Sequence, residues 1–228
     1  MSYLGTNKIG KLFFGSVEIA KAYLGTDVVF QSGPPAPPSP GSDGKIWAYY
    51  VTTANNQSVT LVSSSATGLP STMVVDDVEV TFASSYTFAE AGEHIVKFPI
   101  GATVPTYMFY NLSSYIKEVY WPEGPTTLGG NTFRGNTSIK KALISSTVTT
   151  IATRAFYNTE QIQIIVSKAT TPPTVANSTT LYGLNSLQAI YVPYSANHSI
   201  LNAYKAKQYW SNYAAKMVEL NRNGTIPE

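Results

Sequence analysis

The sequence contains no cysteine, which excludes disulfides, thiolate metal ligands and thiol nucleophiles. Charged residues make up only 12% of the 228 residues, about half of the usual share. No apolar run reaches the roughly 18 residues of a membrane-spanning helix. The 15 basic and 13 acidic side chains are scattered, without a cluster that could follow a phosphate backbone. We therefore expect neither a membrane span nor a nucleic-acid partner.

Groups suited to acid–base catalysis are also scarce. The two histidines, His94 and His198, lie far apart in the chain, and we expect both to be polar surface residues. The acidic run "DDVE" at residues 76–79 lacks the glycine and further ligands of a calcium loop, so a solvated turn is expected. Glu90 and Glu93 do not form a recognisable glycosidase pair. We predict no catalytic residue, cofactor or metal site, and no enzymatic activity.

Apolar residues make up 43% of the chain, which indicates a folded protein. Local composition and repeats divide the sequence into five segments. Residues 33–44, "GPPAPPSPGSDG", have the composition of an extended linker and follow a repetitive start at residues 1–32. Residues 45–93 carry β-branched and aromatic residues between turn residues, which predicts a β region. Residues 94–198 hold an internal repeat, and residues 199–228 are expected to form a helical cap and tail.

The internal repeat is the strongest signal in the sequence. One register starts each unit, with spacings of 23 and then 25 residues: Ile116, Ile139, Ile162 and Leu187. A second register marks the centre of each unit: Phe109, Phe133, Phe156 and Leu181. Short strands such as "IKEVYWP" would stack, and the two registers would form internal ladders. The pattern predicts a mainly β solenoid with short helices.

The segments "VTTIATRAFYNTEQIQIIVS" and "TYMFYNLSSYIKEVYWPEG" resemble BspA-like leucine-rich repeats, whose core is roughly Ile-(Gly/Ala)-x-x-Ala-Phe-x-x-Cys-x-x-Leu. The end, "LQAIYVPYSANHSILNAYKAKQYWSNYAAKMVEL", is similar to the terminal cap of that family. The resemblance covers residues 94–220, with Asn or Gly where the family often has Cys. It implies a leucine-rich-repeat solenoid and a role in adhesion at a bacterial surface.

The C-terminal cap is also expected from its apolar stripe, which would close the open end of the solenoid. The stripe consists of Leu201, Tyr204, Trp210, Tyr213, Met217 and Leu220. Without such a cap, the last strand would expose an unpaired edge.

Aromatic residues beside the buried positions are candidates for a ligand face. Strand alternation places Tyr120 and Trp121 on opposite faces, so that at least one of them would face outward. Tyr157 follows the buried Phe156. Exposed aromatic rings stack on sugars and proteins, so Tyr120, Trp121 and Tyr157 are predicted to bind a cell-surface glycan or protein. The alternative is ordinary packing of these rings.

Residues 1–31 contain three copies of a short motif, in which Gly5, Gly15 and Gly25 each follow two large apolar residues. The motif predicts strands that reverse at Gly-Thr or Gly-Ser. A segment of this size cannot bury its own apolar surface. We therefore expect it to bind other protein chains, either in a homo-oligomer or in a virion. The predicted contact residues are Tyr3, Leu4, Phe13, Phe14, Tyr23, Leu24 and Phe30. The alternative is that residues 1–31 add strands to the main domain.

These "YLG(S/T)" repeats are similar to N-terminal segments of phage tail or fibre-type proteins. The resemblance implies a non-catalytic attachment protein at a virion surface or otherwise outside the cell, with residues 1–32 as anchor and the repeats recognising a host surface. The absence of a secretory signal favours this hypothesis. The alternative is a secreted bacterial cell-surface adhesin, and a more distant one is a glycan-active enzyme that uses residues 45–92.

Overall fold

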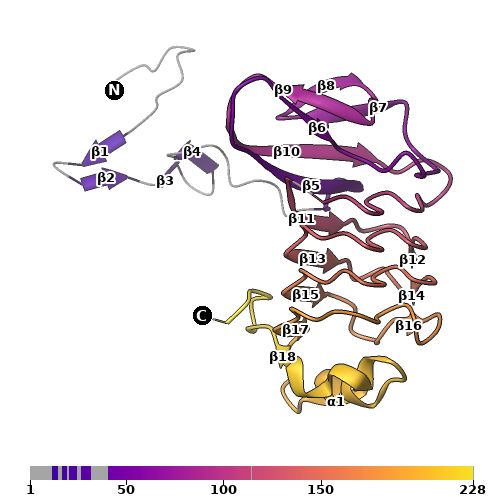
Figure 1. Cartoon of the computed structure of the whole chain (residues 1–228). Helices are drawn as coiled ribbons and strands as arrows, with labels where there is room; N and C mark the ends of the chain where they lie inside the picture. Colours follow the sequence, from indigo (N-terminus) through magenta and orange to yellow (C-terminus); the bar gives the residue numbers. More distant parts are fainter. Residues whose placement is uncertain are drawn as a thin grey trace. The chain divides into compact units, whose positions relative to one another are not determined.

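The chain divides into two compact units, Met1–Pro40 and Gly41–Glu228 (Figure 1). The computed structural model describes residues 12–14, 17–19, 21–24 and 27–31 of the first unit, and residues 41–113 and 115–227 of the second. No helix in these described ranges is long and apolar enough to cross a membrane.

The described part of the first unit consists of two antiparallel hairpins. Their strands are β1 (Leu12–Phe14) with β2 (Val17–Ile19), and β3 (Lys21–Leu24) with β4 (Asp27–Gln31). Phe14 pairs with Val17 and Leu24 pairs with Asp27 at the ends of these strands. The strands of the second and third copies of the motif are therefore present as antiparallel pairs, while the predicted reversals at Gly15-Ser16 and Gly25-Thr26 lie outside the described residues. The first copy, with Tyr3 and Leu4, lies outside the described residues, as do residues 32–40 of the predicted linker.

In the described residues of the second unit, nine strands form one sheet in the order β18-β17-β15-β13-β11-β5-β10-β7-β8. Their bounds are β5 (Lys45–Thr52), β7 (Thr72–Val75), β8 (Val78–Thr81), β10 (Gly92–Pro99), β11 (Ile116–Trp121), β13 (Lys141–Ile144), β15 (Ile164–Ser167), β17 (Ala189–Val192) and β18 (Met217–Glu219). A smaller parallel sheet contains β12 (Thr127–Leu128), β14 (Thr150–Ile151) and β16 (Thr174–Val175). A separate two-stranded antiparallel sheet pairs β6 (Gln57–Thr60) with β9 (Ser85–Phe88).

Successive repeats stack by adding one strand to each parallel sheet. Figure 1 shows β11, β13, β15 and β17 one after another, with β12, β14 and β16 beside them. Backbone hydrogen bonds join the central turns of successive repeats. The N–H of Phe109 donates to the carbonyl of Thr132, and the N–H of Phe133 donates to the carbonyl of Ala155, both at 2.8 Å. The two predicted registers are therefore confirmed in three dimensions, and all of their members are buried.

The central phenylalanines form a column inside the stack. The rings of Phe109 and Phe133 are nearly parallel, at 7°, with centroids 5.8 Å apart. Phe133 and Phe156 follow at 4.9 Å. Leu181 takes the next place with 3% exposure, as the sequence predicts.

A second column of alternating asparagine and glycine lies two residues after the phenylalanines. Asn111, Gly135, Asn158 and Gly183 all adopt positive φ, between 53° and 78°. A Cβ on Gly135 would lie 2.1 Å from Oδ1 of Asn111, and one on Gly183 would lie 2.3 Å from Oδ1 of Asn158. Each asparagine side chain therefore occupies the space that the glycine of the next repeat leaves open.

The start of the repeats differs from the prediction. The repeat pattern predicts that the strand of the first repeat, which begins near residue 94, lies beside β11. Instead β5 lies between β10 and β11 and pairs antiparallel with both. Strands β5, β7 and β8 of the predicted β region, together with the start of β10, thus belong to the same sheet as the repeats. Strand β5 buries Ile46, Ala48 and Tyr50 completely at the N-terminal end of the core.

The C-terminal segment is only partly helical. It consists of α1 (Ser199–Ala206), a 3-10 helix η1 (Trp210–Lys216) and then β18, which pairs parallel with β17. Tyr204 and Trp210 are fully buried and donate to the carbonyls of Ala169 and Pro173, each at 2.8 Å. The helices therefore cover the end of the core, but the last element extends the sheet where the sequence predicts a helical lid over its edge.

Candidate ligand-binding face

Strand β11 separates the two aromatic residues of the predicted ligand face. Trp121 belongs to the main core, is fully buried and donates from Nε1 to the carbonyl of Thr127 at 3.2 Å. The prediction that Trp121 contributes to an exposed face is wrong, because the next strand, β12, covers its indole. Tyr120 lies on the opposite side of the strand, as alternation predicts.

Tyr120 belongs to a cross-strand row on the outer face of the large sheet. The row runs through paired residues of five strands: Trp47, Tyr120, Leu143, Val166 and Tyr191. Neighbours cover most of the Tyr120 ring, which is only 9% exposed. The ring of Tyr49 lies 5.2 Å away and the ammonium of Lys141 lies 5.4 Å away. Tyr120 thus faces outward but offers less surface than the sequence indicates.

Beside Tyr120 the outer face is hollowed by a pocket of about 300 Å³, here called the Tyr49 hollow. It is lined by Tyr49, Tyr50, Val51, Glu93, Lys117, Glu118 and Tyr120. The pairing of β11 with β5 shifts register between Ile116 and Glu118 at this point, which separates the two strands locally. The hollow combines aromatic rings with two carboxylates and one ammonium group.

Hydrogen bonds fix one side of the Tyr49 hollow. The hydroxyl of Tyr120 donates to Oε2 of Glu118 at 2.7 Å, and Nζ of Lys141 donates to the same oxygen at 2.9 Å. Burial, together with the Glu118 carboxylate, raises the pKa of Tyr120 well above its usual value. The same two causes raise the pKa of Tyr49. Both phenols therefore stay protonated at neutral pH and remain hydrogen-bond donors.

Tyr157 does not line the Tyr49 hollow. It belongs to a partly exposed ladder on the central turns: Tyr107, Tyr110, Arg134, Tyr157 and Tyr182. The guanidinium of Arg134 lies 5.4 Å from the ring of Tyr110 and 5.7 Å from that of Tyr157. The structure therefore does not bring Tyr120 and Tyr157 into one site.

Sequence reasoning misses Tyr49, Glu93 and Glu118 as lining residues. They come from three strands, β5, β10 and β11, whose adjacency leaves no periodic trace in the sequence. The outward alternation of Trp47, Tyr49 and Val51 in β5 is the signal that could have indicated the aromatic wall.

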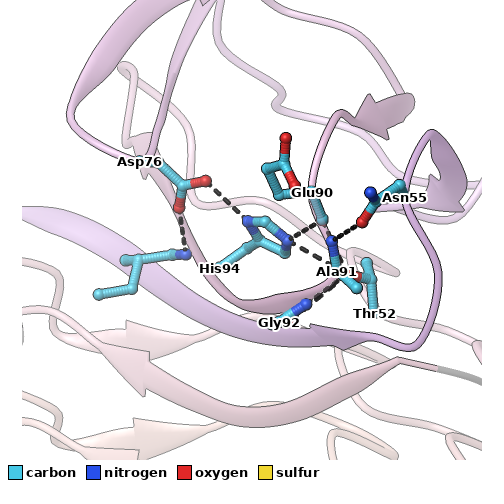
Figure 2. Close-up of polar contacts among 8 residues, drawn as sticks. Thr52, Asn55, Asp76, Glu90, Ala91, Gly92 and His94 are labelled. Carbon is cyan, nitrogen blue, oxygen red and sulfur yellow. Dashed lines mark hydrogen bonds and ion pairs between the residues drawn. The ribbon is translucent and has the colours of Figure 1, made fainter.

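His94 is buried, with 8% exposure, which contradicts the prediction of a surface residue. Figure 2 shows its ring between Asp76 on one side and Glu90 with Thr52 on the other. Nδ1 lies 2.7 Å from Oδ2 of Asp76, and Nε2 lies 3.1 Å from the Glu90 carbonyl and 3.2 Å from Oγ1 of Thr52. The ring also stacks on Phe88 at 4.0 Å. His198, in contrast, is exposed as predicted.

An acid, a histidine and a hydroxyl in this order are also the elements of nucleophilic catalysis. Thr52, however, is only 3% exposed, and its Oγ1 accepts the N–H of Gly92 at 3.0 Å. Asp76 also accepts the N–H of Ile95 at 2.9 Å. The cluster therefore ties the turn between β7 and β8 to β10, which is a structural role.

His94→Phe is expected to lower the free energy of unfolding by about 1–3 kcal/mol, because the ring against Phe88 remains while Asp76 and Glu90 lose their partner. His198→Phe is the matched control, since it removes an exposed histidine that also faces a carboxylate. It should change stability by about 0.5 kcal/mol or less. Urea unfolding of both variants measures the difference, and equal losses would contradict the structural role of His94.

The run at residues 76–79 forms the predicted turn only at Asp76 and Asp77, which have positive φ, whereas Val78 and Glu79 begin β8. Among the described residues, no group of three or more His, Asp or Glu side chains is arranged to hold a metal ion.

Parallel ladders of strands, repeated about every 23 residues around a column of phenylalanines, define a leucine-rich-repeat protein. The model of the BspA type leucine-rich repeat region matches residues 79–208 in six copies. Because the match spans more than half of the chain, the protein belongs to this family. The match begins at residue 79, in β8, and therefore includes part of the predicted β region at residues 45–93. No curated protein matches the sequence.

Proposed function

We propose that the protein is a non-catalytic attachment protein that binds a surface glycan in the Tyr49 hollow and other protein chains through residues 1–31. Membership of a family of repeat-containing surface and binding proteins supports the class. The observation that carries the ligand assignment is the Tyr49 hollow itself, with its aromatic rings and carboxylates on the outer face of the sheet.

The chemistry of the Tyr49 hollow favours a sugar rich in hydroxyl groups. The carboxylates of Glu93 and Glu118 accept hydrogen bonds from hydroxyls, and the Tyr49 ring gives an apolar surface for the C–H face of a pyranose. A volume of about 300 Å³ is at the lower end of the range for ligand pockets, which favours a single sugar unit.

The first unit supports the attachment role. An isolated two-stranded hairpin is marginally stable in water, so β1–β2 and β3–β4 need a partner surface. The proposed contact residues within these strands are Phe13, Phe14, Tyr23, Leu24 and Phe30. We favour the proteins of a phage-like particle as partners, on the resemblance of the "YLG(S/T)" repeats, and a bacterial cell surface is the alternative support.

Tyr49→Ala is expected to weaken binding to neutral glycans by about tenfold or more, because the main ring of the hollow is removed. Tyr191→Ala is the matched control, since Tyr191 lies on the same outer face but does not line the hollow. A glycan array followed by calorimetry on each hit measures both variants. If Tyr49→Ala and the parent bind every glycan equally while remaining folded, the Tyr49 hollow is not the ligand site.

Deletion of residues 1–31 tests the anchor separately. We expect the full chain to self-associate or to bind particle proteins, and the shortened chain to be a monomer with unchanged glycan binding. Sedimentation analysis of both chains measures the association. A full chain with the mass of one copy that also fails to bind particle proteins would exclude the anchor.

A further inference from the structure

A second hollow, of about 430 Å³, lies where the parallel strands end, and we call it the Arg222 hollow. The segment after each parallel strand contributes at least one residue to it, among them Glu123 after β11, Ser146 after β13, Lys168 after β15, Tyr194 after β17 and Arg222 after β18. Because these strands are parallel and in register, their carboxyl ends meet along one edge. The stacking of repeats therefore builds this hollow.

The charges of the Arg222 hollow favour an anion. Lys168 and Arg222 are its basic residues, and Glu123 is its one acidic residue. The Glu123 carboxylate already accepts the N–H of Ser146 at 3.0 Å, the hydroxyl of Ser146 at 2.8 Å and the N–H of Thr147 at 3.2 Å. Although partial burial raises it, these bonds hold the pKa of Glu123 below its usual value. The Glu123 carboxylate therefore stays ionised with its oxygens engaged by Ser146 and Thr147, and the two cations still leave the lining with a net positive charge.

Tyr194 holds Arg222 in place. The guanidinium lies 5.2 Å from the ring centroid of Tyr194, and Nε donates to the Tyr194 hydroxyl at 3.2 Å. An arginine whose Nε is engaged in this way keeps its Nη pair as the fork that binds a carboxylate through two bonds. The ring and the guanidinium together form a fixed platform that a flexible lysine could not provide.

We propose that the Arg222 hollow binds a sugar unit that carries a carboxylate. Arg222 and Lys168 take the carboxylate, while Oδ1 of Asn221, Nδ2 of Asn223 and Oγ of Ser146, the last as an acceptor, offer partners for sugar hydroxyls. The volume admits a whole sugar ring. None of the lining residues is shared with the Tyr49 hollow, so this is a second site with a different charge preference.

The test titrates the full chain with methyl β-glucuronide and methyl β-glucoside, which differ only in the carboxylate, and follows amide shifts by NMR. We expect the glucuronide to bind about tenfold more tightly, with shifts in the segments after β15, β17 and β18. Acetate and inorganic phosphate distinguish a sugar site from a plain anion site, and each should bind about tenfold more weakly than the glucuronide.

Arg222→Gln should reduce glucuronide affinity about tenfold, whereas Arg154→Gln, which removes an exposed arginine that does not line the hollow, should leave it unchanged. Tyr49→Ala should also leave it unchanged, so failure of the Tyr49 hollow does not affect this result. Equal binding of glucuronide and glucoside, equal binding of glucuronide and acetate or phosphate, or full affinity in Arg222→Gln would each overturn the proposal.

Discussion

Phe133→Ala is expected to destabilise the second unit by about 3–5 kcal/mol, the usual cost of removing a buried aromatic ring. Phe133 is 1% exposed and lies between Phe109 and Phe156 in the phenylalanine column. Each repeat contacts mainly its neighbours, so a cavity at this position weakens the interfaces on both sides. Urea unfolding followed by tryptophan fluorescence measures the loss, because Trp47, Trp121 and Trp210 lie in different parts of the unit.

Tyr182→Ala is the control, because Tyr182 also stacks on an aromatic neighbour, Tyr157 at 5.7 Å, but is 62% exposed. We expect a loss of about 1 kcal/mol or less. If both variants lose the same free energy, the phenylalanine column is not the main support of the stack.

Gly135→Ala is expected to cost about 2–3 kcal/mol, which is large for the addition of one methyl group. Two effects add at this position. A φ of 64° strains any residue with a Cβ, and that Cβ would lie 2.1 Å from Oδ1 of Asn111. Either the asparagine side chain must move out of its place or the turn must open. Thermal and urea unfolding measure the loss.

Two further variants separate the causes. Gly101→Ala is the matched control, since Gly101 has no positive φ and its Cβ would meet no atom within 4 Å. Asn111→Gly in the Gly135→Ala chain removes the steric effect and should recover part of the stability, leaving only the backbone strain. An additive result for Asn111→Gly and Gly135→Ala would show that the two side chains do not compete for space.

The periodic part of the fold can be predicted from the sequence because each repeat restates the same physical requirement. The positions equivalent to Ile139 and Phe133 are buried in every repeat. The spacing of these positions therefore indicates where both the strand and the turn of each repeat lie. The position of β5 cannot be obtained in this way. Its partners, β10 and β11, follow it in the chain, and antiparallel pairing between distant segments imposes no spacing that a single sequence displays.

The sites are harder to predict because burial depends on neighbours from other strands. Alternation correctly places Tyr120 opposite Trp121, but only the structure shows that Tyr120 is 9% exposed and has Tyr49 and Lys141 beside its ring. His94 is a similar case, since its partner Asp76 comes from another turn. The residues of the Arg222 hollow do carry a weak signal, because Glu123, Ser146 and Lys168 recur at nearly the repeat spacing.

The alternating column of Asn111, Gly135, Asn158 and Gly183 restricts how the protein can change in length. If the repeat that contains Gly135 were deleted, Asn111 and Asn158 would face each other across a spacing that leaves 2.1 Å for the first atom of a side chain. If the repeat that contains Asn158 were deleted, Gly135 and Gly183 would face each other and the space of the asparagine side chain would be empty. Deletion or duplication of two repeats would preserve the alternation. Successive repeats therefore alternate between an asparagine type and a glycine type, and this alternation favours the gain or loss of repeats in pairs.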